Sequence, residues 1–256
     1  MNAAGNRQRL DILLCEKGLT QSRERARALI MEGKILVNDQ PVNKPGTRVS
    51  PDDTLIVKED LPYVSRGGLK LEAAIRQLHL DVRDKVCMDI GASTGGFTDC
   101  LLQSGARRVF AVDVGYGQLA WKLRQDPRVV IMERTNIRAL PPESITEIVD
   151  IAVIDVSFIS LKIVIPCAVR FLRPDSGRII ALIKPQFEVG KNKIGKGGVV
   201  RDPVLQEAVI ADIVSFCAGI GLDSGEVIPS PITGPKGNRE FLLPLVLKGD
   251  CGPGLP

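Results

Sequence analysis

The sequence predicts an α/β protein in which a small α+β unit precedes a doubly wound, mostly parallel sheet. From residue 86 onward, short apolar runs alternate with helical segments, which is the pattern of parallel strands joined by crossover helices. Before residue 62, two short helical patterns lead into small β-rich pieces separated by turn residues. The 256 residues are enough for one small and one medium-sized domain.

The first domain is expected over residues 7–62. Two short helices are predicted at 9–18 and 21–34, and each pattern reaches a glycine, a residue that readily adopts the left-handed conformation found after helix ends. Residues 35–60 contain Asn-Asp, Pro-Gly and Pro-Asp-Asp turns between short apolar pieces, which is typical of small strands. We place a linker at 63–69.

The second domain is expected over residues 70–248, and an amphipathic helix near its start leads into the sheet. Each predicted strand is a short apolar run followed by a polar or glycine-containing segment. The strands are expected at 86–90, 108–113, 129–132, 150–155, 177–183, 223–229 and 239–247. The glycine- and proline-containing tail is predicted to be disordered.

Composition narrows the classes of protein. The net charge of +4 permits a polyanionic partner without requiring one. Six scattered cysteines without a C-x-x-C pair, together with a single histidine, argue against a zinc site and a disulfide framework, so we expect no metal and a reducing cytoplasm. We also expect no membrane association, because charges interrupt every long apolar run.

The stretch DIGASTGGFTD, which follows the first strand of the sheet, indicates a ligand site. Its glycines let the backbone approach a ligand closely, and Asp113 ends the next strand, where an acid can accept hydrogen bonds from ribose hydroxyls. The spacing departs from G-x-G-x-x-G, and bulky Phe97 stands where a pyrophosphate would meet the helix. S-adenosylmethionine is therefore favoured over NAD, with a purely structural turn as the alternative. The predicted cofactor-binding residues are Asp89, Gly91, Ala92, Ser93, Thr94, Gly95, Gly96, Phe97, Asp113, Asn136 and Asp155.

Charged residues stand at the ends of several apolar strands. Asp155 and Lys184 each follow such a strand, where a charge is costly unless it has a partner or a task. Glu240 opens the last strand and would lie at the same edge if that strand runs antiparallel, while Lys70 begins the helix that leads into the sheet. A desolvated lysine can act as a general base towards an alcohol. For Lys70 alone, a solvated surface charge is the alternative.

Several stretches resemble one known family. YVSRGGLKLE, DIGASTGGFTD, DVSFISL, LIKPQFE and GNREFL are similar to the TlyA family, sometimes labelled hemolysin A, and the second domain resembles RNA ribose 2′-O-methyltransferases of the FtsJ/RrmJ type. The resemblance implies a Rossmann-like sheet that binds S-adenosylmethionine and methylates cytidine riboses of rRNA, in the small or large ribosomal subunit. It also implies a catalytic tetrad, namely Lys70, Asp155, Lys184 and Glu240.

Basic residues of the first domain suggest an RNA surface, and this domain resembles a small RNA-binding domain named after a small-subunit ribosomal protein. Arg23 and Arg27 are four positions apart and share one helix face, although neighbouring glutamates allow a merely solvated surface. A glycine- and lysine-rich segment after Lys184 could clamp an RNA backbone. The predicted RNA-binding residues are Arg23, Arg27, Lys34, Lys44, Arg66, Lys191, Lys193 and Lys196.

Three other functions are weighed against rRNA methylation. The protein could bind RNA without catalysis, but all four tetrad positions are occupied by the expected residues. It could be a membrane-lytic hemolysin, although the sequence contains no amphipathic membrane helix. An NAD-dependent enzyme is the weakest alternative, because the glycine spacing does not fit.

Overall fold

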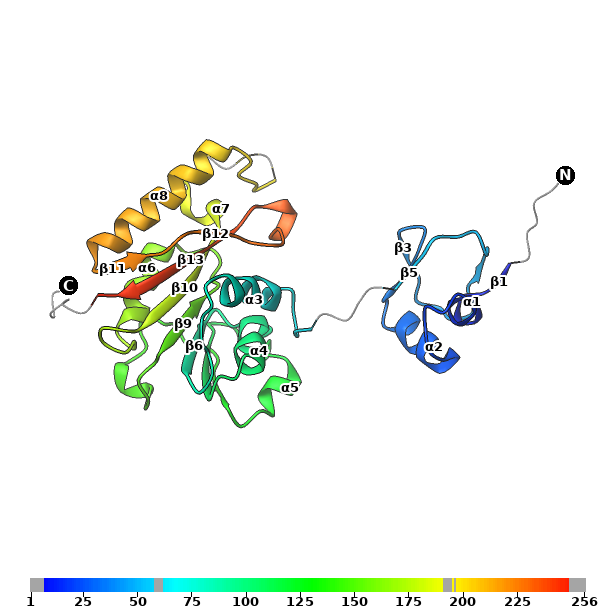
Figure 1. Ribbon diagram of the computed structural model, residues 1–256, viewed down its shortest axis with the longest axis horizontal. Helices are drawn as coiled ribbons and strands as arrows, with labels where there is room; N and C mark the ends of the chain where they lie inside the picture. Colours follow the sequence, from blue (N-terminus) through cyan, green and yellow to red (C-terminus); the bar gives the residue numbers. More distant parts are fainter. Residues whose placement is uncertain (1–6, 58–61, 191–194, 196, 249–256) are drawn as a thin grey trace. The chain divides into compact units, whose positions relative to one another are not determined.

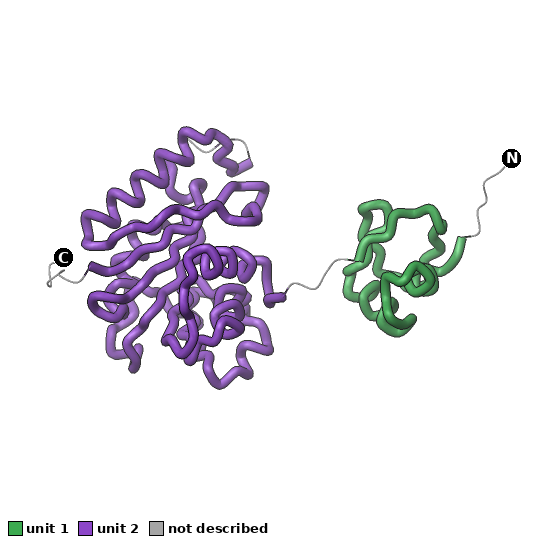
Figure 2. Tube along the Cα trace, in the orientation of Figure 1, with its two compact units in different colours: residues 1–61 green, residues 62–256 purple. Residues whose placement is uncertain are grey.

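The computed structural model describes residues 7–57, 62–190, 195 and 197–248. It divides into two compact units, Met1–Leu61 and Pro62–Pro256 (Figures 1 and 2). Each unit has its own hydrophobic core, since the buried residues of the first form one cluster and those of the second form two others. Within the described residues, no helix is both long and apolar enough to cross a membrane.

The described residues of the first unit form two helices and two very small sheets. Its elements are β1 (Gln8–Arg9), α1 (Leu10–Glu16), α2 (Arg23–Met31), β2 (Ile35–Val37), β3 (Gln40–Pro41), β4 (Arg48–Val49) and β5 (Leu55–Val57). The two predicted helices are confirmed. Ser22 caps helix α2, since its side chain accepts a hydrogen bond from the backbone amide of Arg25, and Gly18 and Gly33 have positive φ after the helices. Leu10, Leu14, Ile30 and Ile35 are fully buried between these elements.

The second unit is built on a mixed sheet of eight strands. The strands are β6 (Val86–Ile90), β7 (Arg108–Val112), β8 (Val129–Met132), β9 (Ile151–Ile154), β10 (Arg178–Ile183), β11 (Leu222–Ser224), β12 (Ile228–Pro229) and β13 (Phe241–Leu247). Their order is β11-β13-β10-β9-β6-β7-β8, and β12 also pairs with β13. The predicted doubly wound fold is confirmed. The single strand expected at 223–229 is wrong, because two short strands, β11 and β12, pair with different parts of β13.

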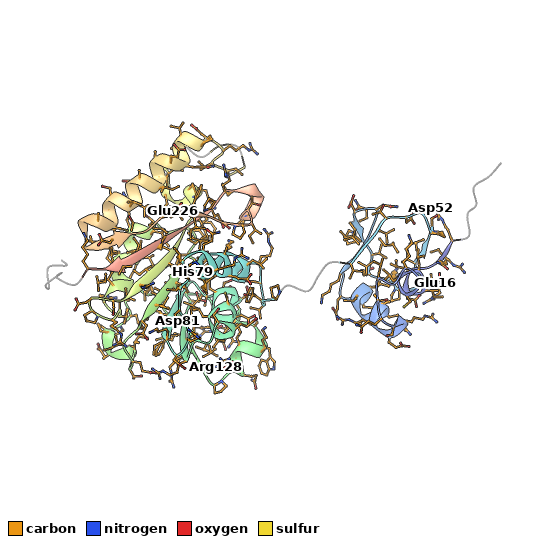
Figure 3. The ribbon with its side chains drawn as sticks, viewed as in Figure 1. Glu16, Asp52, His79, Asp81, Arg128 and Glu226 are labelled. Carbon is orange, nitrogen blue, oxygen red and sulfur yellow. The ribbon has the colours of Figure 1, made fainter. Side chains whose placement is uncertain are left out.

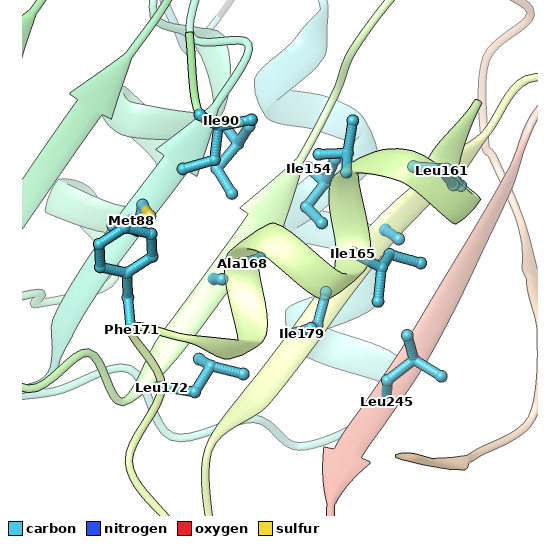
Figure 4. Packing of buried hydrophobic residues seen from close by; sticks show 14 of the residues in the cluster. Met88, Ile90, Ile154, Leu161, Ile165, Ala168, Phe171, Leu172, Ile179 and Leu245 are labelled. Atoms are coloured by element: carbon cyan, nitrogen blue, oxygen red, sulfur yellow. The ribbon is translucent and has the colours of Figure 1, made fainter. Parts of the chain in front are cut away.

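Helices cover both faces of this sheet (Figure 1). They are α3 (Gly67–Gln77), α4 (Gly96–Gln103), α5 (Trp121–Arg124), α6 (Leu161–Val169), α7 (Pro185–Glu188) and α8 (Pro203–Gly219), with short 3-10 turns η1 (Pro142–Ser144) and η3 (Pro235–Gly237). Buried residues of α3, α4 and α5 share one cluster, and those of α6 and α8 share the other. Figure 4 shows Leu161 and Ile165 of α6 packed with strand residues such as Ile154, Ile179 and Leu245.

The structure differs from the expected linker at 63–69. Tyr63 is buried in the core of the second unit, and the backbone amide of Val64 donates a 2.8 Å hydrogen bond to Asp99. Helix α3 already begins at Gly67, and a Cβ at Gly68 would lie 2.2 Å from the Tyr63 ring. These residues therefore belong to the second unit, because packing against Tyr63 fixes the chain before the helix starts.

The single histidine of the chain, His79, follows α3 and is exposed. The charged side chains of Asp81 and Arg128 are exposed as well (Figure 3). No group of three or more histidine, cysteine, aspartate or glutamate side chains that could hold a metal ion occurs among the described residues. These exposed side chains contrast with Lys70, Lys184 and Glu240, which are buried at the carboxyl edge of the sheet.

Candidate active site

The carboxyl ends of the parallel strands place three predicted residues at one edge of the sheet. Strands β6, β9 and β10 are parallel neighbours, and Gly91, Asp155 and Lys184 are the residues that follow them. Strand β13 runs antiparallel to β10, with Phe241 opposite Ile183. Because antiparallel strands bring a start beside an end, Glu240 lies at the same edge, as expected from the sequence.

Lys184 and Asp155 form an ion pair at the end of neighbouring strands. The Nζ atom of Lys184 lies 2.5 Å from Oδ1 of Asp155 and donates a 3.1 Å hydrogen bond to Oγ of Ser157. Lys184 is only 9% exposed. Asp155 therefore compensates a charge that would otherwise be costly at a buried position, while Ser157 orients the amine.

Lys70 and Glu240 form a second ion pair, which is more deeply buried. The Nζ atom of Lys70 lies 2.6 Å from Oε2 of Glu240, and the two residues are 8% and 2% exposed. The other carboxylate oxygen, Oε1, packs against Gly234, where a Cβ would lie only 1.9 Å away. Glycine at position 234 thus leaves the space that the carboxylate of Glu240 occupies.

One cavity of about 500 Å³ joins the two pairs. Its polar lining includes the side chains of Lys70, Asp155 and Lys184 together with Ser65 and Ser157. Glu240 does not line this cavity, but it binds Lys70 from behind the wall. The structure therefore brings three of the four predicted catalytic residues to one cavity and gives the fourth a supporting position.

The glycine-rich turn after β6 forms another side of this cavity. Gly91 has a φ of +87°, and a Cβ there would lie 2.5 Å from the carbonyl oxygen of Asp155. At Gly96, a Cβ would lie 2.2 Å from Oγ of Ser65. Glycine is required at both positions because strand ends and the start of α3 approach the turn closely. The turn residues that line the cavity are Gly91, Ala92, Ser93, Thr94, Gly96 and Phe97.

A second cavity of about 430 Å³ lies next to the first, and Gly91, Ser93, Asp155 and Ser157 line both. The second cavity combines the polar side chains of Asp113 and Asn136 with the apolar side chains of Ile90, Val112, Ile137, Val156 and Ile159. Such a mixture suits a nucleoside, because an apolar slot can hold the base and a carboxylate can hold the ribose.

The carboxylate of Asp113 is fixed by the backbone on both sides. Its Oδ2 accepts a 2.7 Å hydrogen bond from the amide of Ser93, and its Oδ1 accepts a 2.6 Å hydrogen bond from the amide of Gly115. A carboxylate has about four lone-pair positions, so two remain for hydroxyl donors. The residues present therefore fit the adenosine part of S-adenosylmethionine.

Two predicted cofactor residues lie outside both cavities. Asp89 is fully buried and accepts hydrogen bonds of 2.9 Å and 2.7 Å from the amide and hydroxyl of Thr98. Its side chain points to the face covered by α4, because successive residues of a strand alternate between faces. Burial raises the pKa of Asp89 to about 7. Gly95 has a φ of +93°, and a Cβ there would lie 2.2 Å from the side chain of Leu123. Both residues support the turn through contacts with Thr98 and Leu123, and neither lines a cavity.

Ser65 and Ser157 also line the first cavity, although neither was predicted from the sequence. Ser157 carries a recognisable signal, since it stands two positions after the strand-ending Asp155. Ser65 carries none, because its place depends on the packing of the segment before α3. Arg66, predicted as an RNA contact, also lines this cavity, and its Nη2 donates a 2.7 Å hydrogen bond to the carbonyl oxygen of Thr233.

The basic residues of the first unit have different surroundings. Arg23 donates a 3.0 Å hydrogen bond to the fully buried Asp11, which also binds Arg9. Although burial opposes it, these two guanidinium groups hold the pKa of Asp11 below its usual value. Arg23 is therefore partly a structural residue, although its side chain is exposed, as are those of Arg27 and Lys44.

The four other lysines predicted to bind RNA lie beside an acidic residue or outside the described residues. Lys34 forms a 2.7 Å ion pair with Glu32. The remaining predicted RNA contacts, at Lys191, Lys193 and Lys196, lie outside the described residues, as does the tail beyond residue 248.

Comparisons with known proteins show the family of this chain. Residues 63–246 match the model of the FtsJ-like methyltransferase family, and residues 8–55 match the S4 domain. The chain is 50% identical to a candidate rRNA methyltransferase, YqxC, of Bacillus subtilis, with 95% of this chain and 87% of that protein covered. It is 47% identical to the 16S/23S rRNA (cytidine-2′-O)-methyltransferase TlyA of Mycobacterium tuberculosis, with 93% and 89% covered.

A solved structure of a candidate hemolysin from Streptococcus thermophilus is 44% identical to this chain, with a TM-score of 0.74. The match covers 96% of this chain and 90% of that one. Similarity therefore extends over both units and includes the edge of the sheet where the cavities lie. The chain belongs to the FtsJ-like methyltransferase family, so it is an S-adenosylmethionine-dependent methyltransferase with an S4 domain before its catalytic unit.

Proposed function

We propose that the protein methylates the ribose 2′-hydroxyl of a cytidine in rRNA, in the cytoplasm, with Lys184 as the general base. The observation that carries this proposal is the pair of buried lysine–carboxylate contacts beside the cavity suited to adenosine. The choice of cytidine and rRNA is supported by the printed activity of the 47% identical relative. A protein that only binds RNA would have no need for two charged pairs of this kind at a ligand cavity.

The cofactor is expected to occupy the second cavity and to extend into the first. Asp113 would hold the ribose hydroxyls, Asn136 the base, and the turn around Ser93 the remaining polar atoms. When bound, S-adenosylmethionine supplies an electrophilic methyl group. The protein then has to orient the acceptor hydroxyl and remove its proton.

Lys184 is the residue best suited to accept that proton. Its amine lies in the first cavity, partly removed from water, and Ser157 and Asp155 fix its position. An amine that has released its proton to solvent can accept the hydroxyl proton of the ribose. Asp155 then stabilises the ammonium group that forms, because the two groups are only 2.5 Å apart.

Lys70 is proposed to orient the ribose. Its ammonium group reaches the same cavity from α3, and the carboxylate of Glu240 holds it there. Three N–H donors are available on a lysine, so binding to Glu240 leaves others for a hydroxyl or phosphate oxygen of the RNA. The two lysines therefore have different tasks, one in positioning and one in proton transfer.

The S4 domain is proposed to bind rRNA, either free or within a ribosomal subunit. Exposed basic residues such as Arg27 and Lys44 can contact phosphates, which fixes position without reading sequence. The target nucleotide would then be chosen by the shape of the RNA and by the cavity of the second unit.

Mapping of ribose methylation tests this function. Purified protein with S-adenosylmethionine should methylate a cytidine 2′-hydroxyl in isolated ribosomal subunits or in rRNA. Ribosomes from cells that lack the gene should lose the same modification. Methylation on a base nitrogen or carbon would contradict the proposed reaction, and an absence of methyl transfer to any ribosomal RNA would contradict the proposed substrate.

Replacing Asp113 with alanine should weaken cofactor binding by about 1–3 kcal/mol, because the ribose hydroxyls would lose a charged acceptor. Calorimetry with S-adenosylmethionine measures this effect. Asp81→Ala is the matched control, since Asp81 is exposed and binds Arg83 outside the cavities. Equal affinity of the Asp113 variant and the control would remove Asp113 from the cofactor site.

Charge reversal of Arg27 and Lys44 together should weaken rRNA binding and reduce the magnitude of its salt slope by about 1–2, since fewer counterions would be released. Arg23 is omitted, because Arg23→Glu would face the buried Asp11 and destabilise the domain. Affinity measured over a range of salt concentrations checks the prediction. Reversal of Arg83 and Lys85 in the second unit is the control, and an equal effect of both pairs would show a non-specific response.

A further inference from the structure

The buried side chain of Asn238 joins two loops beside the substrate cavity. It is 3% exposed and lies two positions before Glu240. Its Oδ1 accepts a 3.1 Å hydrogen bond from the amide of Val200, and its Nδ2 donates to the carbonyl oxygens of Gly198 at 3.1 Å and Pro235 at 3.2 Å. One side chain thus satisfies three backbone groups from two segments.

The segment bound on one side is a wall of the cavity. Residues 232–235 line the first cavity, and the carbonyl oxygen of Thr233 accepts a hydrogen bond from Arg66. The backbone carbonyl of Asn238 accepts a 2.8 Å hydrogen bond from the amide of Gly234, and Gly234 packs on the Glu240 carboxylate. The position of this wall therefore determines where Glu240 holds Lys70.

The segment bound on the other side follows the glycine-rich stretch after Lys184. Gly198 has a φ of +81°, Val200 is buried, and the carbonyl oxygen of Val200 accepts a 2.8 Å hydrogen bond from the buried side chain of Gln206 in α8. Gln206 and Asn238 therefore hold opposite backbone groups of Val200. Only Asn238 also binds the wall at 232–235.

We propose that Asn238 is a positioning residue for methyl transfer. Its side chain fixes the wall at 232–235 against the segment 198–200, and the wall in turn fixes the Lys70–Glu240 pair. This inference rests on the proposed function of the site. Asparagine suits the task because it accepts one hydrogen bond and donates two from the same planar group. An ionised aspartate has the same shape, but it would place an oxygen against two carbonyl oxygens.

An aspartate at this position provides a switchable test. In Asn238→Asp, the neighbouring carbonyl groups disfavour the ionised form, which raises the pKa of the introduced carboxyl group. The protonated acid again has one donor and one acceptor in the geometry of the amide. Acidification should therefore restore the contact with one carbonyl group, whereas Asn238→Leu has no group to titrate.

The experiment compares single-turnover methylation of rRNA by wild type, Asn238→Asp, Asn238→Leu and the control Gln206→Leu. At about pH 8, the rate with saturating RNA should fall roughly 10- to 100-fold in both Asn238 variants, the scale expected for a misplaced catalytic group. The wild-type-to-variant ratio should shrink towards about pH 6 for Asn238→Asp and stay constant for Asn238→Leu. Gln206→Leu should retain the wild-type rate within about threefold at saturating RNA, because the wall keeps its contacts.

Cofactor affinity separates this role from a general loss of structure. All variants should bind S-adenosylmethionine within about twofold of wild type, because the adenosine part of the cofactor is expected in the second cavity, which residues 232–238 do not line. The inference is wrong if Asn238→Asp transfers methyl groups as fast as wild type at both pH values, or if its rate ratio is independent of pH. An inactive wild-type protein would instead contradict the proposed function itself.

Discussion

Lys184→Arg should lower the single-turnover rate of methylation by about 10²–10⁴-fold, the usual cost of losing a general base. Arginine keeps the positive charge, and therefore the ion pair with Asp155, but it does not release a proton at working pH. Fold and cofactor affinity should therefore change little. Methyl transfer from labelled S-adenosylmethionine to rRNA in one turnover measures the effect.

Lys162→Arg is the matched control for this substitution. Lys162 lies on α6 of the same unit and pairs with Asp212 at 2.6 Å, but it does not line either cavity. This variant should keep full activity. A rate for Lys184→Arg within a few-fold of wild type would show that Lys184 is not the base, and the proposed mechanism would then have to be replaced.

Glu240→Gln should lower the free energy of unfolding of the second unit by about 3–5 kcal/mol, because it leaves the buried ammonium group of Lys70 without its counter-charge. Methylation should be lost as well, since Lys70 would no longer be held in the cavity. Denaturant unfolding and the methylation assay measure the two effects separately. Asp212→Asn, which breaks an exposed pair, should leave both nearly unchanged.

A double substitution separates stability from catalysis. Replacing a buried ion pair by apolar residues of similar volume is often neutral or stabilising. The variant with Lys70→Met and Glu240→Leu should therefore regain much of the stability lost in Glu240→Gln and still be inactive. Recovery of methylation together with stability would show that the pair serves the fold alone.

Most strands of the second unit could be predicted from the sequence, because each is an apolar run of characteristic length that ends in glycine or a charged residue. The division of 223–229 into two strands could not be predicted in this way. Both pieces are short, and their pairing depends on which part of β13 each one meets. The position of residues 63–69 was likewise decided by packing of Tyr63 on Gly68.

Residue type alone did not separate cavity-lining residues from supporting ones. Asp89 and Asp113 were both predicted to bind the cofactor, but Asp89 binds Thr98 inside the core and Asp113 lines a cavity. Arg23 and Arg27 share a helix pattern, but Arg23 binds the buried Asp11. In each case the partner residue lies in another turn or element, so the local sequence pattern does not reveal the contact.

The sequence by itself determined the two-unit organisation, the parallel sheet, the glycine turn and the four charged residues of the proposed tetrad. The organisation, the sheet and the turn follow from local periodicity and from the need for glycine where backbones approach closely. Asp155 and Lys184 stand out because a charge is costly at the end of an apolar strand, whereas the tetrad as a set, with Lys70 in it, was implied by the resemblance to the family. Only the tertiary structure decided how the four charges pair and which of them reach the cavity. It also decided that Gly234 leaves room for the Glu240 carboxylate and that the side chain of Asn238 binds the carbonyl oxygen of Pro235 in the same loop. Contacts such as that of Lys70 with Glu240 join residues far apart in the chain, so their geometry exists only once β13 has paired with β10 and the loops have closed over the sheet edge.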